Sequence, residues 1–287
     1  MKKILLLLYL ALPYFAFSQK SDAALLKKIQ ETVQGFRGVV GIQVLDIKKN
    51  RYTAINPDTV FPTASIVKIP IMIGVMDKIE KGELDYHQKL VYKDSLYYAG
   101  EDILGSFKHN ESIELSKVLM LMLTTSDNTA SLWLQGLAGS GSAINKLMDG
   151  LGLPNTKVNS RTPGREDARK EYGWGQTTPK EMAELMRLIV GKKVISPSAS
   201  EKMLRLLGRN YWDEEALGEI PAGVFTASKN GAVNASRSEV VYVNHPKRPY
   251  IFCIITKNNV DQSWKKENEA WEMTRKLSRV FWNHFNK

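Results

Sequence analysis

The chain has 287 residues, of which 43% are hydrophobic and 24% charged, so its composition is that of an ordinary globular protein. These values exclude a disordered, collagen-like or low-complexity chain, and the length allows enough burial for stability without disulfides or a structural metal. The one cysteine, Cys253, lies in an apolar run typical of a buried strand. A single cysteine excludes disulfide frameworks, cysteine-based zinc sites and dithiol redox motifs.

Basic residues outnumber acidic ones by 40 to 30, which gives a formal net charge of +10. The basic residues are spread along the chain and mixed with acidic ones, so no nucleic-acid surface is predicted.

The N-terminus has the pattern of a secretory signal peptide. Two lysines precede an apolar stretch over residues 4–17, which is too short for a membrane-spanning helix. Small residues at Ala16 and Ser18 predict cleavage after Ser18. Because no cysteine stands at this junction, no lipid anchor is expected. Residues 1–18 are therefore predicted to be removed, leaving a secreted or periplasmic protein without a stable membrane anchor.

Hydrophobic periodicity divides the rest of the chain into helices and strands in a mixed order. In chain order, the pattern predicts a helix over 22–36 capped by Ser21, strands over 38–47 and 52–55, helices over 66–79, 115–122 and 129–136, a polar loop over 159–176, a helix over 179–190, strands over 224–228, 239–243 and 250–256, and a helix over 263–284. The helix over 66–79 is apolar nearly all round, which indicates burial on every side, and Gly82 is expected to end it. Thr178 and Glu181 match a capping box at the start of the helix over 179–190.

Strands near both ends of the chain are expected to pair into one antiparallel sheet. The predicted fold is therefore of the α+β class, an α/β sandwich whose five-stranded antiparallel sheet is flanked by the terminal helices and holds an inserted all-helical subdomain. Residues 19–287 would form a single domain, with a sheet part over 19–60 and 215–287 and a helical part over 61–214. A ligand cleft is expected where the two parts meet.

Familiar hydrolytic motifs are missing, because the histidines are far apart and neither a Gly-x-Ser-x-Gly elbow nor a His-Glu-x-x-His helix occurs. A serine nucleophile would need another base. Ser65 precedes the buried helix, at the positive end of its dipole, and Lys68 follows one turn later on the same side. A partly desolvated lysine there can accept the serine proton. Alternatively, Ser65 only caps the helix, and a Ser-x-x-Lys sequence also occurs at Ser263–Lys266.

A second polar motif, Ser126-Asp127-Asn128, lies at the junction between two predicted helices. Ser126 there can relay a proton to a leaving nitrogen, and Asn128 can bind a substrate amide. The alternative is that Asp127 or Asn128 only caps the following helix.

A third motif, Lys229-Asn230-Gly231, ends the strand predicted over 224–228. Gly231 allows a ligand backbone to approach closely, and Lys229 places a cation in the cleft. By itself this tripeptide is ordinary turn chemistry. The three motifs in this order, on a helix start, a helix junction and a strand end, are very improbable as a coincidence.

This combination resembles class A β-lactamases and penicillin-binding proteins, and the resemblance spans residues 22–285. It implies that Ser65 attacks an acyl group, that Lys68 helps to take its proton and that Ser126 passes a proton to the leaving nitrogen. Lys229 would be the fourth catalytic residue. The backbone N–H groups of Ser65 and Ala232 would form the oxyanion hole. The implied substrate-binding set is Tyr98 as an aromatic wall, Asn128, Asn230, Gly231, Ala232, and Arg237 for a substrate carboxylate.

Two departures from the family pattern concern binding and deacylation. Asn230 replaces the usual hydroxyl residue, although its amide can still donate a hydrogen bond. Counted back without gaps from Thr177, the family's deacylating glutamate falls on Thr162. The family's loop-bracing Arg–Asp pair is also incomplete, because Arg161 is present but Gly175 stands in place of the aspartate. The loop carboxylates Glu166, Asp167 and Glu171 could substitute for the missing glutamate or could be only solvated charges.

The resemblance thus predicts an exported, monomeric serine hydrolase that hydrolyses β-lactam amide bonds through an acyl-enzyme at Ser65. No metal or organic cofactor is expected, and the partner is a small β-lactam or a D-Ala-D-Ala-like peptide. One alternative is a penicillin-binding protein or peptidoglycan DD-peptidase that is acylated but deacylates slowly. Another is a catalytically silent binding module of the same fold.

Overall fold

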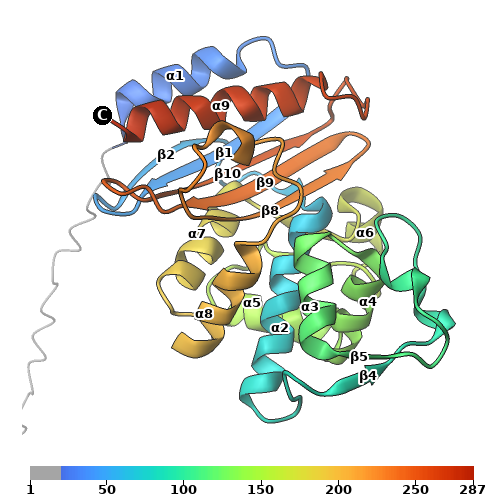
Figure 1. The fold of residues 1–287 in the computed structure, drawn as a ribbon. Helices are drawn as coiled ribbons and strands as arrows, with labels where there is room; N and C mark the ends of the chain where they lie inside the picture. The colour runs from blue at the N-terminus through green and yellow to red at the C-terminus, as the bar shows by residue number, and fades with distance from the viewer. Residues whose placement is uncertain (1–20) are drawn as a thin grey trace, which may run out of the picture.

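A five-stranded antiparallel sheet separates two helical layers in the computed structural model, which describes residues 21–287 (Figure 1). The predicted signal peptide, with its cleavage site after Ser18, lies outside the described residues. Within the described part of the chain, no helix is long and apolar enough to cross a membrane.

The sheet has the strand order β2-β1-β10-β9-β8, and all neighbouring strands are antiparallel. Its strands are β1 (Val39–Asp46), β2 (Arg51–Ile55), β8 (Thr226–Val233), β9 (Ser236–Val243) and β10 (Tyr250–Lys257). The central pair joins the two ends of the chain, because β1 and β10 pair from Val39 opposite Lys257 to Asp46 opposite Tyr250. The predicted α+β fold class with a five-stranded antiparallel sheet is confirmed.

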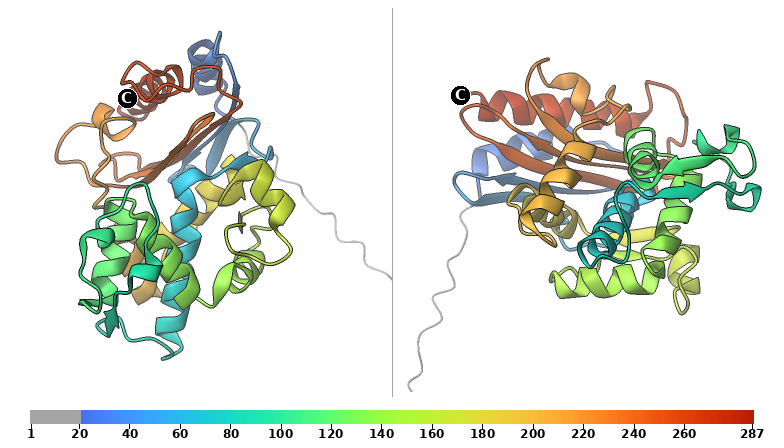
Figure 2. Two further views of the ribbon diagram at one scale, coloured as in Figure 1. Left: turned by 90° about the vertical axis from the view of Figure 1, so that its right-hand side faces the viewer. Right: turned by 60° about the horizontal axis from the view of Figure 1, so that its bottom comes forward.

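Two terminal helices, α1 (Ala23–Val33) and α9 (Glu269–Phe285), cover one face of the sheet (Figures 1 and 2). Helix α1 is capped by Asp22, whose Oδ1 accepts from the N–H of Leu25 at 3.0 Å, so the predicted cap at Ser21 is wrong. The second oxygen of Asp22 lies 3.0 Å from Nε2 of His284 on α9 and so links the two helices.

The other face of the sheet carries the helical layer. It contains α2 (Lys68–Glu80), α3 (Leu115–Thr124), α4 (Asn128–Leu137), α5 (Ser140–Gly150), α6 (Glu166–Tyr172), α7 (Pro179–Val190) and α8 (Pro197–Leu207). Two small sheets lie between these helices in the sequence. In one, β7 (Gly175–Thr177) pairs with β3 (Phe61–Pro62) on one side and β6 (Lys157–Val158) on the other; in the second, β4 (Lys89–Val91) pairs with β5 (Ser112–Glu114).

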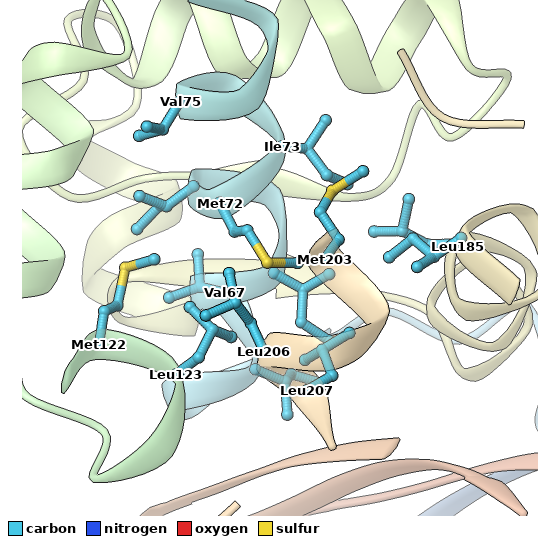
Figure 3. Close-up of a cluster of buried hydrophobic side chains, with 14 of the residues drawn as sticks. Val67, Met72, Ile73, Val75, Met122, Leu123, Leu185, Met203, Leu206 and Leu207 are labelled. Carbon is cyan, nitrogen blue, oxygen red and sulfur yellow. The ribbon is translucent and has the colours of Figure 1, made fainter. Parts of the chain in front are cut away.

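Helix α2 is the centre of this layer. Every residue from Lys68 to Met76 is buried, as the all-round apolar sequence predicts. Figure 3 shows side chains of α2 packed against those of α3, α7 and α8. Gly82, at φ +73°, follows the helix in the left-handed conformation, which confirms the expected end of α2.

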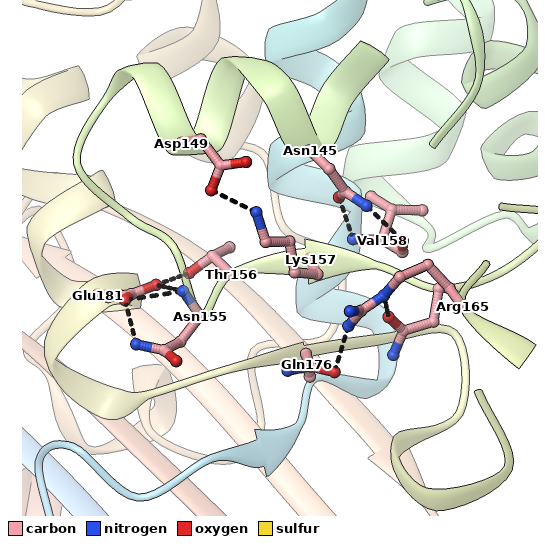
Figure 4. A network of polar contacts seen from close by, with 10 residues as sticks. Asn145, Asp149, Asn155, Thr156, Lys157, Val158, Arg165, Gln176 and Glu181 are labelled. Atoms are coloured by element: carbon pink, nitrogen blue, oxygen red, sulfur yellow. Dashed lines mark hydrogen bonds and ion pairs between the residues drawn. The ribbon is translucent and has the colours of Figure 1, made fainter. Parts of the chain in front are cut away.

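The segment 159–176, predicted as a loop without secondary structure, contains α6 and most of β7. Helix α6 buries no side chain, so it has no apolar stripe by which the sequence could reveal it. The next helix, α7, is capped as predicted, since Thr178 Oγ1 accepts from the N–H of Glu181 at 3.1 Å. The Glu181 carboxylate, however, accepts hydrogen bonds from Asn155 and Thr156 instead of completing the capping box (Figure 4).

A buried carboxyl group on the terminal-helix side of the sheet lowers stability at neutral pH. Glu239 on β9 is 3% exposed, and its Oε1 has no hydrogen-bond partner among the described residues. Burial raises the pKa of Glu239 to about 8, although the N–H of Ala216 donates to its other oxygen. In the unfolded chain the same group ionises near its ordinary pKa of about 4.3. Between about pH 4.3 and pH 8, the folded protein therefore holds a proton that the unfolded chain releases, and this lowers the free energy of unfolding.

We expect Glu239→Gln to raise the free energy of unfolding by about 2 kcal/mol at neutral pH, because the amide needs no proton. The gain should vanish near pH 4, where the unfolded carboxyl is protonated as well. Urea unfolding of both proteins at the two pH values measures this, and an equal difference at both would contradict it.

Candidate active site

Ser65 lies in a single 3₁₀ turn, Ala64–Val67, that leads directly into α2. Ala64, just before it, has φ +47°, and Ser126 has φ +66°. Residues with side chains rarely adopt this left-handed conformation, and such strained positions concentrate at functional sites. The two serines that the sequence singles out are thus next to or within strained backbone.

The Lys68 side chain joins the first two motifs. Its Nζ lies 3.1 Å from Ser65 Oγ, 3.0 Å from Ser126 Oγ and 3.0 Å from Asn128 Oδ1. The lysine is fully buried, and no carboxylate in residues 21–287 lies within ion-pair distance of it. Burial, and next the nearby charge of Lys229, lowers the pKa of Lys68 well below its ordinary value. Lys68 can therefore be uncharged and accept a proton.

Asp127 fixes the junction that presents Ser126 and Asn128. Its Oδ1 accepts from the N–H of Ala130 at 2.7 Å and so caps α4. Its Oδ2 accepts from the N–H groups of Ile103 and Leu104 at 2.6 and 3.0 Å. The capping interpretation is correct for Asp127, but this carboxylate also holds the loop around residue 103 against the site.

The third motif lies inside strand β8, not at its end. The strand continues to Val233 and returns as β9, so the predicted strand end after residue 228 is wrong. Gly231 comes so close to Ser65 that an added Cβ would lie 2.5 Å from Ser65 N. Burial lowers the pKa of Lys229 to about 7, and its Nζ donates to the backbone oxygen of Asn230 at 2.8 Å and to its side-chain oxygen at 3.1 Å.

Arg237 does not enter the cleft, so its expected role in binding a substrate carboxylate does not agree with its contacts. Successive side chains of a strand point to opposite faces, and Ser238 points to the Ser65 side, where its Oγ donates to the carbonyl of residue 63. The Arg237 guanidinium donates to carbonyl oxygens of the β8–β9 turn and to Ser263 O at 2.9 Å. It also lies 4.7 and 4.5 Å from the ring centres of Trp264 and Trp271.

A cavity of about 550 Å³ opens beside Ser65, between the helical layer and the β8–β9 hairpin. Among the residues that line it are Ser65, Asn128, Ala232, Glu101, Glu171 and Trp174. Tyr98 packs edge-on against Trp174, with ring centres 5.1 Å apart, and its N–H donates to Thr129 Oγ1. The sequence gives no signal for Glu101 or Trp174, because both lie in irregular polar segments that only the fold brings to Ser65.

The loop residues that bear on deacylation are widely separated. Thr162 is buried away from the cavity: its Oγ1 donates to Ser160 O at 2.9 Å and packs against Gly141 of α5. Glu166 and Asp167 are exposed in the first turn of α6, whereas Glu171, in its last turn, lines the cavity.

Another arginine braces this loop. An added Cβ at Gly175 would lie 2.5 Å from Val67 Cγ2, so an aspartate does not fit there. The loop is held instead by Arg165, whose Nε donates to Asn159 Oδ1 at 3.0 Å and whose Nη2 donates to Gln176 Oε1 at 2.6 Å (Figure 4). The described residues contain no group of three His, Cys, Asp or Glu side chains placed to hold a metal ion.

Comparison with known proteins agrees with this geometry. The family model described as the β-lactamase enzyme family matches residues 24–285. The chain belongs to this family. The extended-spectrum β-lactamase PER-1 of Pseudomonas aeruginosa is 24% identical over 275 residues, covering 91% of this chain and 88% of PER-1. The β-lactamase VEB-1 of the same organism is 21% identical and covers 99% and 98% of the two chains.

Solved structures share the fold. The TLA-1 extended-spectrum β-lactamase superposes with a TM-score of 0.83 at 18% identity and covers 93% of this chain and all of that one. The structure of PBP-A superposes with a TM-score of 0.82 at 22% identity and covers 93% and 98% of the two chains. At these identities the structures show the β-lactamase-like fold alone. Family membership supports a serine hydrolase of the class A type.

The contact between Gly231 and the backbone of Ser65 gives a test of this geometry. We expect Gly231→Ala to lower the free energy of unfolding by about 1–3 kcal/mol, because the new methyl group meets Ser65 N and other atoms that cannot easily move. Gly136→Ala is the matched control: Gly136 lies in α4 with open space around it, so the change should be neutral or stabilise by up to about 1 kcal/mol. Equal effects in chemical denaturation would contradict the close approach.

Proposed function

We propose that this chain is an exported serine hydrolase that opens β-lactam amide bonds through an acyl-enzyme at Ser65. The observation that carries the proposal is the 3.1 Å distance between Ser65 Oγ and the buried Nζ of Lys68. A serine is a weak nucleophile unless a base takes its proton, and Lys68, with its lowered pKa, is such a base. Export rests on the signal-peptide pattern of residues 1–18, and residues 19–287 would form the single mature domain.

The proposed reaction has a short proton path. Ser65 Oγ attacks the carbonyl carbon as its proton moves to Lys68, and the backbone N–H groups of Ser65 and Ala232 stabilise the oxyanion. The C–N bond then breaks, and the leaving nitrogen takes a proton from Ser126 Oγ. Lys68 Nζ lies 3.0 Å from that oxygen and can restore its proton. Each proton exchanged among these side chains therefore passes between atoms already within hydrogen-bond distance.

Lys229 is the cation proposed for the substrate carboxylate, because Arg237 is occupied elsewhere. Its contact with Asn230 Oδ1 leaves the amide nitrogen of Asn230 free to donate to the same group. With a pKa of about 7, Lys229 is charged at lower pH and loses its charge above neutrality, so binding of the carboxylate should weaken as pH rises through 7.

Ser65→Ala should abolish covalent labelling by penicillins while leaving the fold intact. Ser65 lies at the cavity and its hydroxyl fills no core space, so the free energy of unfolding should change by at most about 1 kcal/mol. Intact-protein mass spectrometry after addition of penicillin G measures the adduct. Labelling that survives in the variant would remove Ser65 as the nucleophile.

A second function, acylation without efficient hydrolysis, is favoured by the loop geometry. Thr162 stands where the family's glutamate is expected, carries no carboxylate and faces α5. PBP-A, which shares the fold, has been solved as an acyl-enzyme complex with penicillin G in a mutant form. The chain would then be a penicillin-binding protein or a peptidoglycan DD-peptidase acting on D-Ala-D-Ala-like peptides. A silent binding module is disfavoured, because Ser65, Lys68 and Ser126 form one connected set.

Turnover of penicillin G should show a burst of one product per Ser65 followed by a slow phase. Attack of water on the acyl-enzyme needs a general base, which contributes roughly 10²–10⁴-fold. Glu171 is the loop carboxylate that lines the cavity, whereas Glu166 on the same helix does not. Glu166→Gln is therefore the matched control for Glu171→Gln.

If no loop carboxylate acts as the base, both variants keep the slow phase of the parent protein, and the slowly deacylating function is supported. If turnover is fast and Glu171→Gln alone reduces it, Glu171 is the base and the β-lactamase function is supported. Stopped-flow absorbance of the β-lactam ring distinguishes these results.

A further inference from the structure

The catalytic cleft carries opposite charges in two different places. Lys68 and Lys229 are fully buried and do not line the open cavity. Two carboxylate residues, Glu101 and Glu171, line that cavity together with Ser65. A substrate bound at Ser65 therefore has the buried cation of Lys229 on one side and carboxylates in the cavity on the other.

The fold holds both carboxylate residues in place. The backbone oxygen of Glu101 accepts from the N–H of Asn128 at 2.8 Å, which fixes its segment to the start of α4. Among residues 21–287, no hydrogen bond or ion pair within the usual distances engages the Glu101 carboxylate. Glu171 lies on the loop that Arg165 braces, and its carboxylate raises the pKa of the neighbouring Tyr172 by accepting its hydrogen bond. Both charges are thus available to a ligand.

The ring of Trp174 belongs to the same wall, and Tyr98 supports it from behind the lining. Trp174 lines the cavity, and Tyr98 packs against it at 5.1 Å. An ammonium group is stabilised both by carboxylates and by aromatic rings. A carboxylate ligand is repelled by the carboxylates and is not stabilised by the rings. This is a second feature, independent of the charges, that favours a cation.

The one basic residue lining the cavity, among those that the structure describes, is Lys257. Its Nζ donates to Val60 O at 2.8 Å and lies 5.1 Å from the ring centre of Phe61. These contacts hold its ammonium group against the protein, so it does not neutralise Glu101 or Glu171 by pairing with them.

We propose that this cleft selects zwitterionic substrates, in which the acyl side chain carries an ammonium group that binds Glu101 and Glu171. The substrate carboxylate lies near Lys229 at the other end of the scissile bond. This inference rests on the proposed acylation of Ser65, which fixes where the acyl group lies. The fitting substrates are amine-bearing penicillins, and acyl-D-Ala-D-Ala peptides whose acyl residue has a free side-chain amine.

Three penicillins with related side chains test the proposal. Benzylpenicillin is neutral at the side-chain α-carbon, ampicillin carries an amine there, and carbenicillin carries a carboxylate. The assay is run near pH 6, where the ampicillin amine is protonated and where Lys229, with a pKa of about 7, carries its charge. We expect the acylation rate constant at Ser65, relative to benzylpenicillin, to be about threefold higher for ampicillin and about threefold lower for carbenicillin.

The double variant Glu101→Gln/Glu171→Gln removes both negative charges from the cavity. Ampicillin should therefore lose its advantage over carbenicillin by about tenfold. Comparing ratios between protein variants cancels the intrinsic reactivity of each penicillin. Glu166→Gln is the control, because it removes a charge from the same helix as Glu171 but not from the cavity. It should leave both ratios unchanged.

The outcomes separate the two proposals. If benzylpenicillin does not label Ser65, the proposed function fails and this inference falls with it. If benzylpenicillin labels Ser65 but the double variant keeps the ratios of the parent protein, the function stands and charge selection by Glu101 and Glu171 is wrong. An equal change in Glu166→Gln would also overturn it, since the effect would then come from net charge.

Discussion

The desolvation of Lys68 is the constraint on which the rest of the site depends. An ammonium group buried without a carboxylate partner is costly, and the protein relieves this cost by lowering its pKa. The hydroxyl groups of Ser65 and Ser126 and the amide of Asn128 then surround a nitrogen that can be neutral. Burial of α2 on all sides therefore gives a lysine that can accept a proton in a site where no histidine is suitably placed.

The site exists only because two layers with different secondary structure meet at atomic contact. Helix α2 and the turn before it supply Lys68 and Ser65, whereas the edge strand β8 supplies Lys229 and the backbone N–H of Ala232. Because Gly231 has no side chain, strand β8 can come into close contact with the backbone nitrogen of Ser65. The junction at Ser126 completes the set from a third direction, and Asp127 holds it there by bonding on both sides.

Local patterns were enough to predict the five strands of the main sheet, the class of fold and the spacing of the three motifs, although α5 and α8 were not among the predicted helices. They could not show α6, because none of its side chains is buried. They also could not show the length of β8, because Lys229-Asn230-Gly231 has the composition of a turn although it pairs with β9. The direction of Arg237 depends on strand alternation and on tryptophans that follow much later in the chain. Glu101 enters the cleft through tertiary structure alone, so no sequence period could reveal it.

The central pairing of β1 with β10 has a consequence for how the chain is made. These strands come from opposite ends of the sequence, so the middle of the sheet cannot close until nearly the whole polypeptide has left the ribosome. The nascent chain must therefore remain open throughout synthesis, with β1 lacking its long-range neighbour. A chain whose sheet closes only on completion is compatible with the export proposed above, because its central strands stay apart until synthesis is nearly finished.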